Sequence, residues 1–213
     1  MKDLQQRWMD LWEKEGVHPT IALVAYGRLA QAYGASNRLY HNLGHIRHCL
    51  QVFDLVAGLA LDRVALEAAL WLHDIVFNVH RNDNEEESAQ YAQALLKKFR
   101  QPERVIENVE SLIMATKKHD GELTEPDDQL IADIDLSSLG LPWDIFWLNT
   151  KDIQNEYSHV DRAVFGAERA KILQSFLDRP FLYYTPEIKD RYEMQARENL
   201  KRSIDLLKEQ AAA

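Results

Sequence analysis

Apolar residues recur every three or four positions along this chain, the spacing that places them on one face of an α-helix. The first predicted helix ends at Gly16 and carries its apolar face on Leu4, Trp8, Leu11 and Trp12. The same period predicts further helices over 20–34, 43–56, 62–73, 84–99, 102–116, 127–139, 142–153, 162–176 and 186–208. Because no alternating strand pattern of useful length is present, the expected fold class is all-α.

Residues at the ends of these segments support several of the boundaries. Thr20 is predicted to cap the second helix, with Leu23 and Leu29 on its inner face, and Asp62 to cap the fourth. The polar stretch 117–127 predicts a loop. No internal repeat, low-complexity run or Gly/Ser linker divides the sequence, so we expect a single all-helical domain over 1–213.

Composition narrows the classes of function. The chain has 213 residues, 46% of them hydrophobic, which suffices for a core without a structural metal or disulfide. A formal net charge of −9 disfavours binding to duplex nucleic acid, which depends on basic side chains. One cysteine excludes an intramolecular disulfide, and neither a signal peptide nor a membrane-spanning stretch is evident. We therefore expect a cytoplasmic protein without a membrane partner.

Histidines are concentrated in one part of the chain, with six of the eight between His41 and His119. His73 and Asp74 directly follow the apolar run ALEAALWL, so they belong to the end of a mostly buried helix. A buried carboxylate is costly unless it is paired or bound to a metal. The alternative is that Asp74 caps the next turn while His73 bonds a backbone carbonyl.

Three other segments extend this set. His45 begins an amphipathic helix, and Asp133 and Asp135 interrupt an otherwise apolar segment. Together with His73 and Asp74 they offer two imidazoles and two carboxylates. That set suits a divalent ion with octahedral preference and open water positions.

The order His45 … His73-Asp74 … Asp135 resembles the HD-domain superfamily of metal-dependent phosphohydrolases. The segments YHNLGHI, HDIVFNVHRNDNEEESA, LIMATKKH, DIDLSSLG and ARENL resemble one subgroup, predicted HD-type hydrolases of largely unassigned substrate. The resemblance runs from about 40 to 200. It implies an HD-type helical bundle with a metal site between central helices. The core would cover about 40–140, and C-terminal helices in 141–210 would pack on it.

The resemblance also implies a ligand set. His45, His73, Asp74 and Asp135 would bind a divalent ion, which could be Mn, Mg, Fe, Ni, Co or Zn, and Asp74 would have a catalytic role in orienting the attacking water. His41, one turn before His45, is an alternative ligand to it. Asp133 is likewise an alternative to Asp135. We prefer His45 because a long amphipathic helix follows it, and Asp135 because the residues after it match the family wording better.

Residues around this set are candidates for contacts to substrate. Some HD enzymes hold a second metal with further histidines, but Asn84 and Glu85 stand where one of those often lies, and His119 stands near a later one. Asn84, Glu85, His119 and Lys117 are therefore expected to contact a water, the substrate or the ligands. The C-terminal helices are expected to cover the site, with polar pocket residues at Tyr157, Arg162, Arg197 and Asn199.

The implied activity is hydrolysis of a phosphate ester or anhydride, on a small, nucleotide-like molecule, by metal-activated water. Two alternatives stay open from the sequence. One is a non-catalytic module that senses a nucleotide with the same geometry. The other is a di-iron oxygenase on the same fold, against which the missing histidine near Asn84 counts.

Overall fold

The fold is built from helices alone, as the period of apolar positions predicts. The computed structural model describes residues 3–117 and 123–212, and within them there is no strand. The helices are α1 (Leu4–Lys14), α2 (Pro19–Tyr33), α3 (Leu43–Val56), α4 (Arg63–Leu72), α5 (Asn84–Lys98), α6 (Glu103–Thr116), α7 (Pro126–Leu136), the 3-10 helix η1 (Ser137–Gly140), α8 (Trp143–Glu156), α9 (Arg162–Leu177) and α10 (Pro186–Ala212). Among these described helices, none combines the length and apolar character that crossing a membrane requires.

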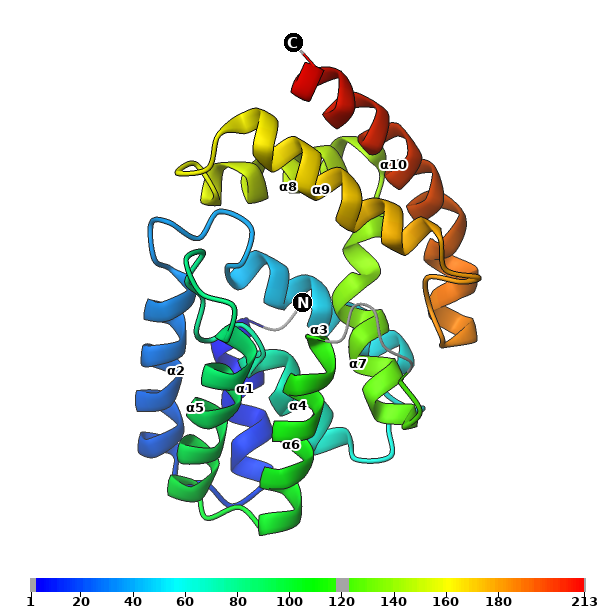
Figure 1. Cartoon of the computed structure of the whole chain (residues 1–213). Coiled ribbons are helices and arrows are strands. Elements are labelled where there is room, and N and C mark those ends of the chain that lie inside the picture. The colour runs from blue at the N-terminus through cyan, green and yellow to red at the C-terminus, as the bar shows by residue number, and fades with distance from the viewer. Residues whose placement is uncertain (1–2, 118–122, 213) are drawn as a thin grey trace.

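Two groups of helices make up the molecule (Figure 1). The first contains α1, α2, α4, α5 and α6, and the second contains α8, α9 and α10, of which α9 and α10 run along each other. Helices α3 and α7 lie between these groups (Figure 1). Buried apolar side chains form one continuous cluster from Leu4 in the first group to Leu207 in the second. The predicted boundary between an inner core at 40–140 and added helices at 141–210 stays a prediction.

Helix α4 is almost entirely buried, and its C-terminal end positions His73 and Asp74. Every residue from 65 to 72 is buried, and the helix packs against α3, α5, α6 and α7. Asp62 caps it as predicted, with its Oδ1 accepting the Ala65 amide at 3.1 Å. His73 is the C-cap residue, and its amide donates to the Ala69 carbonyl at 2.8 Å. The His-Asp pair therefore emerges from the centre of the protein.

Two details of α2 differ from the prediction. The cap is His18, whose ring accepts the Thr20 amide, and Pro19 is the first helical residue, so Thr20 is not the cap. Leu23 is 47% exposed and does not belong to the inner face, which Ala22, Ala25, Leu29 and Tyr33 form. Small alanines face the core here because α1 packs closely against α2, and the larger leucine is left outside.

Three of the four C-terminal residues predicted to line a polar pocket, Arg162, Arg197 and Asn199, have other positions. Arg197 donates to the backbone carbonyls of Leu177 and Arg179, and Asn199 donates to those of Leu139 and Leu141, both at 2.8 Å. Asn199 is 1% exposed. Both side chains thus satisfy carbonyls at the ends of other helical elements and do not line a pocket. Arg162 is exposed at the start of α9.

Candidate metal centre

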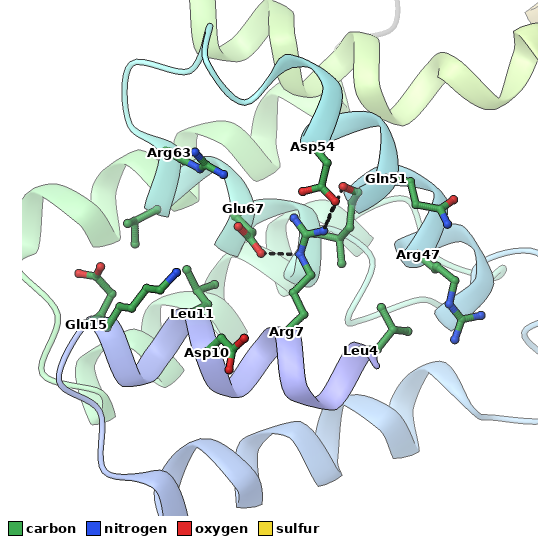
Figure 2. Close-up of a pocket in the computed structure, with 13 residues that line it drawn as sticks. Leu4, Arg7, Asp10, Leu11, Glu15, Arg47, Gln51, Asp54, Arg63 and Glu67 are labelled. Atoms are coloured by element: carbon green, nitrogen blue, oxygen red, sulfur yellow. Dashed lines mark hydrogen bonds and ion pairs between the residues drawn. The ribbon is translucent and has the colours of Figure 1, made fainter. Parts of the chain in front are cut away.

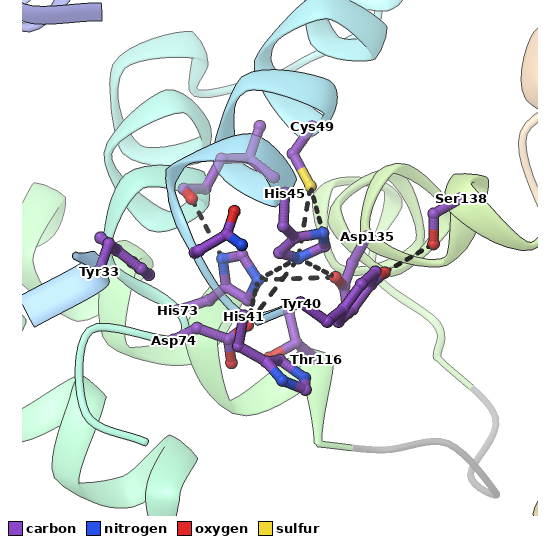
Figure 3. A network of polar contacts seen from close by, with 12 residues as sticks. Tyr33, Tyr40, His41, His45, Cys49, His73, Asp74, Thr116, Asp135 and Ser138 are labelled. Atoms are coloured by element: carbon purple, nitrogen blue, oxygen red, sulfur yellow. Dashed lines mark hydrogen bonds and ion pairs between the residues drawn. The ribbon is translucent and has the colours of Figure 1, made fainter. Parts of the chain in front are cut away.

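Four donor side chains converge where α3, α4 and α7 meet (Figure 3). His45 lies in the first turn of α3, His73 and Asp74 lie at the end of α4, and Asp135 lies in the last turn of α7. The two Nε2 atoms are 3.2 Å apart. Asp135 Oδ1 is 3.0 Å from His45 Nε2 and 3.5 Å from His73 Nε2, and Asp74 Oδ2 is 3.3 Å from His73 Nε2. The sequence placed these four together, and the structure brings them together.

The local structure fixes how the two histidines point. Asn42 caps α3 by accepting the Gly44 amide at 2.6 Å, which places His45 in the first turn and directs it toward α4. His73 Nδ1 lies 3.1 Å from the Leu70 carbonyl oxygen. A carbonyl only accepts, so Nδ1 carries a proton and Nε2 is the ring nitrogen that faces the cluster.

Asp74 is held through its backbone by an arginine that the sequence analysis did not single out. Arg38 is 8% exposed, and its guanidinium donates to the carbonyls of Asp74 and Ile75 at 2.6 and 2.9 Å. This contact fixes the turn that follows α4, where no helical partner exists for those carbonyls. Arg38 therefore sets the direction in which the Asp74 carboxylate points.

The structure separates the alternative ligands that the sequence left open. Asp133 is 1% exposed and accepts the backbone amides of Tyr184 and Thr185 at 3.0 and 2.6 Å, on the α10 side of α7. The His41 ring contacts Glu156 and not the carboxylates of the cluster. His45 and Asp135 are therefore the members of each pair that lie in the cluster.

His41 and Glu156 form a second polar pair beside the first. Glu156 Oε2 lies 2.6 Å from His41 Nδ1, and Glu156 Oε1 accepts the amides of Tyr40 and His41. The His41 ring also stacks on Phe77, with centroids 4.1 Å apart. Nε2 of His41 has no hydrogen-bond partner among the residues that the structure describes. No local pattern points to Glu156, which lies 115 positions from His41 along the chain.

Charges within the cluster favour ionised carboxylates. Burial raises the pKa of Asp74 and of Asp135, but the two histidines outweigh it, so both pKa values lie well below the usual range. Burial likewise lowers the pKa of His73, but the neighbouring carboxylates raise it well above its usual value. The carboxylates that favour a proton on the histidines would equally stabilise a metal cation in the same place.

The spacing of the donors fits a single divalent ion. Nitrogen and oxygen ligands bind such ions at about 2.1 Å, so neighbouring ligands lie about 3.0 Å apart at octahedral angles and about 3.4 Å apart at tetrahedral ones. The two Nε2 atoms are 3.2 Å apart, and the carboxylate oxygens lie 3.0–3.8 Å from them. His45, His73 and Asp135 in particular present one ligand atom each within 4.8 Å of one another. The donor set and its geometry could therefore hold a metal.

A cavity of about 450 Å³ opens directly onto the cluster. His41, Tyr40, Glu85 and Thr116 line it on the cluster side, and α8 and α9 close the far side. Tyr157 lines the cavity as the sequence predicted, whereas Arg162, Arg197 and Asn199 do not. The expectation that C-terminal helices cover the site thus holds for α8 and α9.

The other residues that were predicted to contact substrate, water or the ligands do not all line the cavity. Glu85 lines the cavity. Asn84 is engaged with the backbone of Asn78, and Lys117 pairs with Glu86 at 2.7 Å and bonds the Asn82 carbonyl, so neither side chain lines it. The two contacts of Lys117 tie the loop before α5 and the first turn of α5 to the end of α6. His119 lies outside the described residues.

A larger hollow, of about 610 Å³, lies between α1, α3 and α4 (Figure 2). Arg7 crosses it, donating to Glu67 at 2.7 Å and to Asp54 at 2.8 Å. Arg7 therefore pairs with a carboxylate from each of two neighbouring helices and links α1 to α3 and α4. The chemistry of this hollow is that of a structural ion-pair network, and the cavity beside the His-Asp cluster is the candidate site.

The Glu156 pair predicts a specific pH dependence. Burial raises the pKa of Glu156, but His41 and two backbone amides outweigh this and hold it below its value of 4.5 in an unfolded chain. The carboxylate therefore adds stability above about pH 4.5 that is lost as the pH falls through the lower, folded-state pKa. Between pH 6 and pH 3 the wild type should lose more unfolding free energy than Glu156→Gln, measured by urea unfolding. Parallel curves would contradict the pairing.

Comparisons with protein-family models, with curated proteins and with solved structures found no match to this chain. The function proposed for this chain therefore rests on the residues of the site and on the resemblance of its sequence segments.

Proposed function

We propose that this protein is a metal-dependent phosphohydrolase. The observation that supports the proposal most is the convergence of His45, His73, Asp74 and Asp135 at the edge of a cavity, with carboxylate oxygens 3.0–3.8 Å from the histidine Nε2 atoms. Two imidazoles and two carboxylates leave further positions of a six-coordinate ion for water and substrate. The resemblance to HD-type phosphohydrolases supports the same reaction class.

The four side chains would hold the ion, and the surrounding residues suit that task. His73 is oriented by the Leu70 carbonyl, and Asp74 by the contact of Arg38 with its backbone. Such partners of the ligands fix their direction and raise affinity. When bound, a divalent ion lowers the pKa of a coordinated water and offsets charge on the phosphoryl group.

Asp74 and His41 are the residues to which we assign roles in the reaction. Asp74 has a second carboxylate oxygen beyond the one near His73, and this oxygen orients the attacking water. His41 lines the cavity, and we assign it the role of the general acid that protonates the leaving oxygen of the ester through Nε2. Glu156 is a positioning residue, because it acts on substrate only through the His41 ring at 2.6 Å.

A screen for phosphate release tests the reaction class. Purified protein is incubated with phosphate monoesters, nucleotides and pyrophosphate, each with Mn²⁺, Mg²⁺, Co²⁺, Ni²⁺ or chelator. We expect release from at least one class with an added ion and none with chelator. Equal release with chelator would contradict the metal requirement, and tight binding of a nucleotide without any product would favour a sensing module.

A further inference from the structure

Arg169 is the one lysine or arginine among the described residues that line the candidate cavity. It lies in the middle of α9, and its Nε is shielded from solvent without a hydrogen-bond partner. No carboxylate of the described residues forms an ion pair with it, although Glu168 precedes it in the sequence and pairs with Lys171 instead. Burial lowers the pKa of Arg169, but an arginine stays charged at neutral pH.

An unpaired, largely buried cation is costly unless something else supplies its counter-charge. In the rest of the molecule the buried or half-buried arginines have partners: Arg7 pairs with two carboxylates, and Arg38 bonds two carbonyls. Arg169 differs because it lines a cavity and has, among the described residues, neither an ion pair nor a hydrogen bond at Nε. The missing counter-charge is therefore one that a ligand in this cavity brings.

Arg169 projects from α9 and lines the same cavity as the four donor residues of the cluster. Tyr40 lines it too, and its ring centroid is 5.1 Å from that of His45. Asp135, Tyr40 and Arg169 all line this one cavity. An anionic group beside the metal centre is thus within the field of Arg169. A planar guanidinium matches phosphate oxygens with two parallel hydrogen bonds.

Most side chains on the far side of the cavity are apolar, with Tyr157 and Glu168 as polar neighbours of Arg169 there. Its wall consists of side chains from η1, α8 and α9, among them Leu139, Ile153, Val164, Phe165, Ile172 and Phe176. A nucleobase placed against this wall would leave its ring nitrogens and exocyclic groups facing carbon atoms, at a cost for each unpaired group. An aryl or alkyl group would bury apolar surface there at no such cost.

We propose that Arg169 binds the phosphate of the substrate while the α8–α9 wall holds an apolar organic group. The substrate class is then a phosphate monoester of an aryl or alkyl alcohol, in place of the nucleotide-like molecule that the resemblance implied. This inference rests on the proposed function and names the substrate class of the same site.

Binding of non-hydrolysable phosphonates tests the assignment. Calorimetry with benzylphosphonate and methylphosphonate, in the presence of Mn²⁺, compares the wild type with Arg169→Gln and Arg169→Lys. Arg162→Gln is the matched control, because Arg162 lies on the same helix, is exposed and does not line the cavity. Mn²⁺ affinity and thermal stability are measured for every variant.

We expect the wild type to prefer benzylphosphonate about tenfold or more, from the apolar surface that the ring buries. Arg169→Gln should weaken its binding about tenfold to a hundredfold with Mn²⁺ affinity unchanged. Arg169→Lys should recover part of the loss, and Arg162→Gln should match the wild type. Equal affinities of wild type and Arg169→Gln, or of the two phosphonates, would overturn the inference. Failure of the proposed function would appear separately, as phosphonate binding that depends on Arg169 in a protein that releases no phosphate.

Discussion

Replacing Asp135 with Asn is expected to abolish both metal binding and metal-dependent phosphate release. The change keeps the shape of the side chain but removes one of two negative charges beside His45 and His73. A bound ion supplies several kcal/mol of charge stabilisation in reactions of this type, so phosphate release should fall roughly a thousandfold. Mn²⁺ at about a hundred times its dissociation constant should raise the wild-type Tm by about 5–10 °C, and this rise should vanish in the variant.

Asp133→Asn is the matched control for that experiment. Asp133 is also buried, lies two positions earlier on α7, and contacts the amides of Tyr184 and Thr185. An amide can accept from only one of those groups through its oxygen, so this variant should lose about 1–3 kcal/mol of stability. It should nevertheless keep the rise in Tm with Mn²⁺. A variant pair with these two responses exchanged would show that Asp133 is the ligand.

Replacing His41 with Gln is expected to lower kcat about a hundredfold to ten-thousandfold, the usual contribution of a positioned proton donor. His41 lines the cavity and its Nδ1 is engaged by Glu156, so glutamine removes the proton at Nε2 while retaining polarity. Because His41 is outside the donor cluster, metal affinity should stay within a few-fold of the wild type. The measurement is steady-state phosphate release with Mn²⁺ binding recorded on the same preparations.

His48→Gln provides the comparison on the neighbouring helix. His48 is half-buried on α3, contacts the Ser137 hydroxyl at 2.9 Å and does not line the cavity. We expect this variant to retain kcat within about threefold, since only one ordinary hydrogen bond is affected. Loss of metal binding in His41→Gln, with metal binding intact in His45→Gln, would reverse the assignments of the two histidines.

Much of the fold could be predicted because the information is local. The recurrence of apolar residues every three or four positions sets each helix, and Asn42 and Asp62 cap helices through amides only two or three positions away. Polar side chains within apolar runs must find partners, which made His45, His73 and the aspartates candidates, and the resemblance to HD-type hydrolases indicated the set of four.

What the sequence could not supply depends on contacts between distant segments. Asp133 is excluded as a ligand because it accepts backbone amides 51 and 52 positions away. Glu156 has a role only because it contacts the His41 ring, 115 positions away. Arg169 resembles any helical arginine until α9 is seen to cover the cavity. Leu23 was misplaced because the helical period alone does not say how closely the neighbouring helix approaches.

The polar residues of α10 were predicted to line a pocket for the same reason, that contacts between distant segments are not visible in the sequence. Arg197 and Asn199 have side chains that suit a polar pocket, and the sequence indicated one. In the fold they satisfy backbone carbonyls at the ends of α9 and η1. Helix ends leave such carbonyls without partners, and a single sequence does not reveal which side chain reaches them.

Metal content is the direct test of whether His45, His73, Asp74 and Asp135 hold a divalent ion. Wild type and a His73→Ala, Asp74→Ala double variant are equilibrated with Mn²⁺, freed of unbound ion and analysed by elemental mass spectrometry, with circular dichroism to verify that both are helical. The account predicts roughly one ion per chain in the wild type and essentially none in the folded variant. Equal metal content in the two folded proteins, whether high or absent, would contradict it.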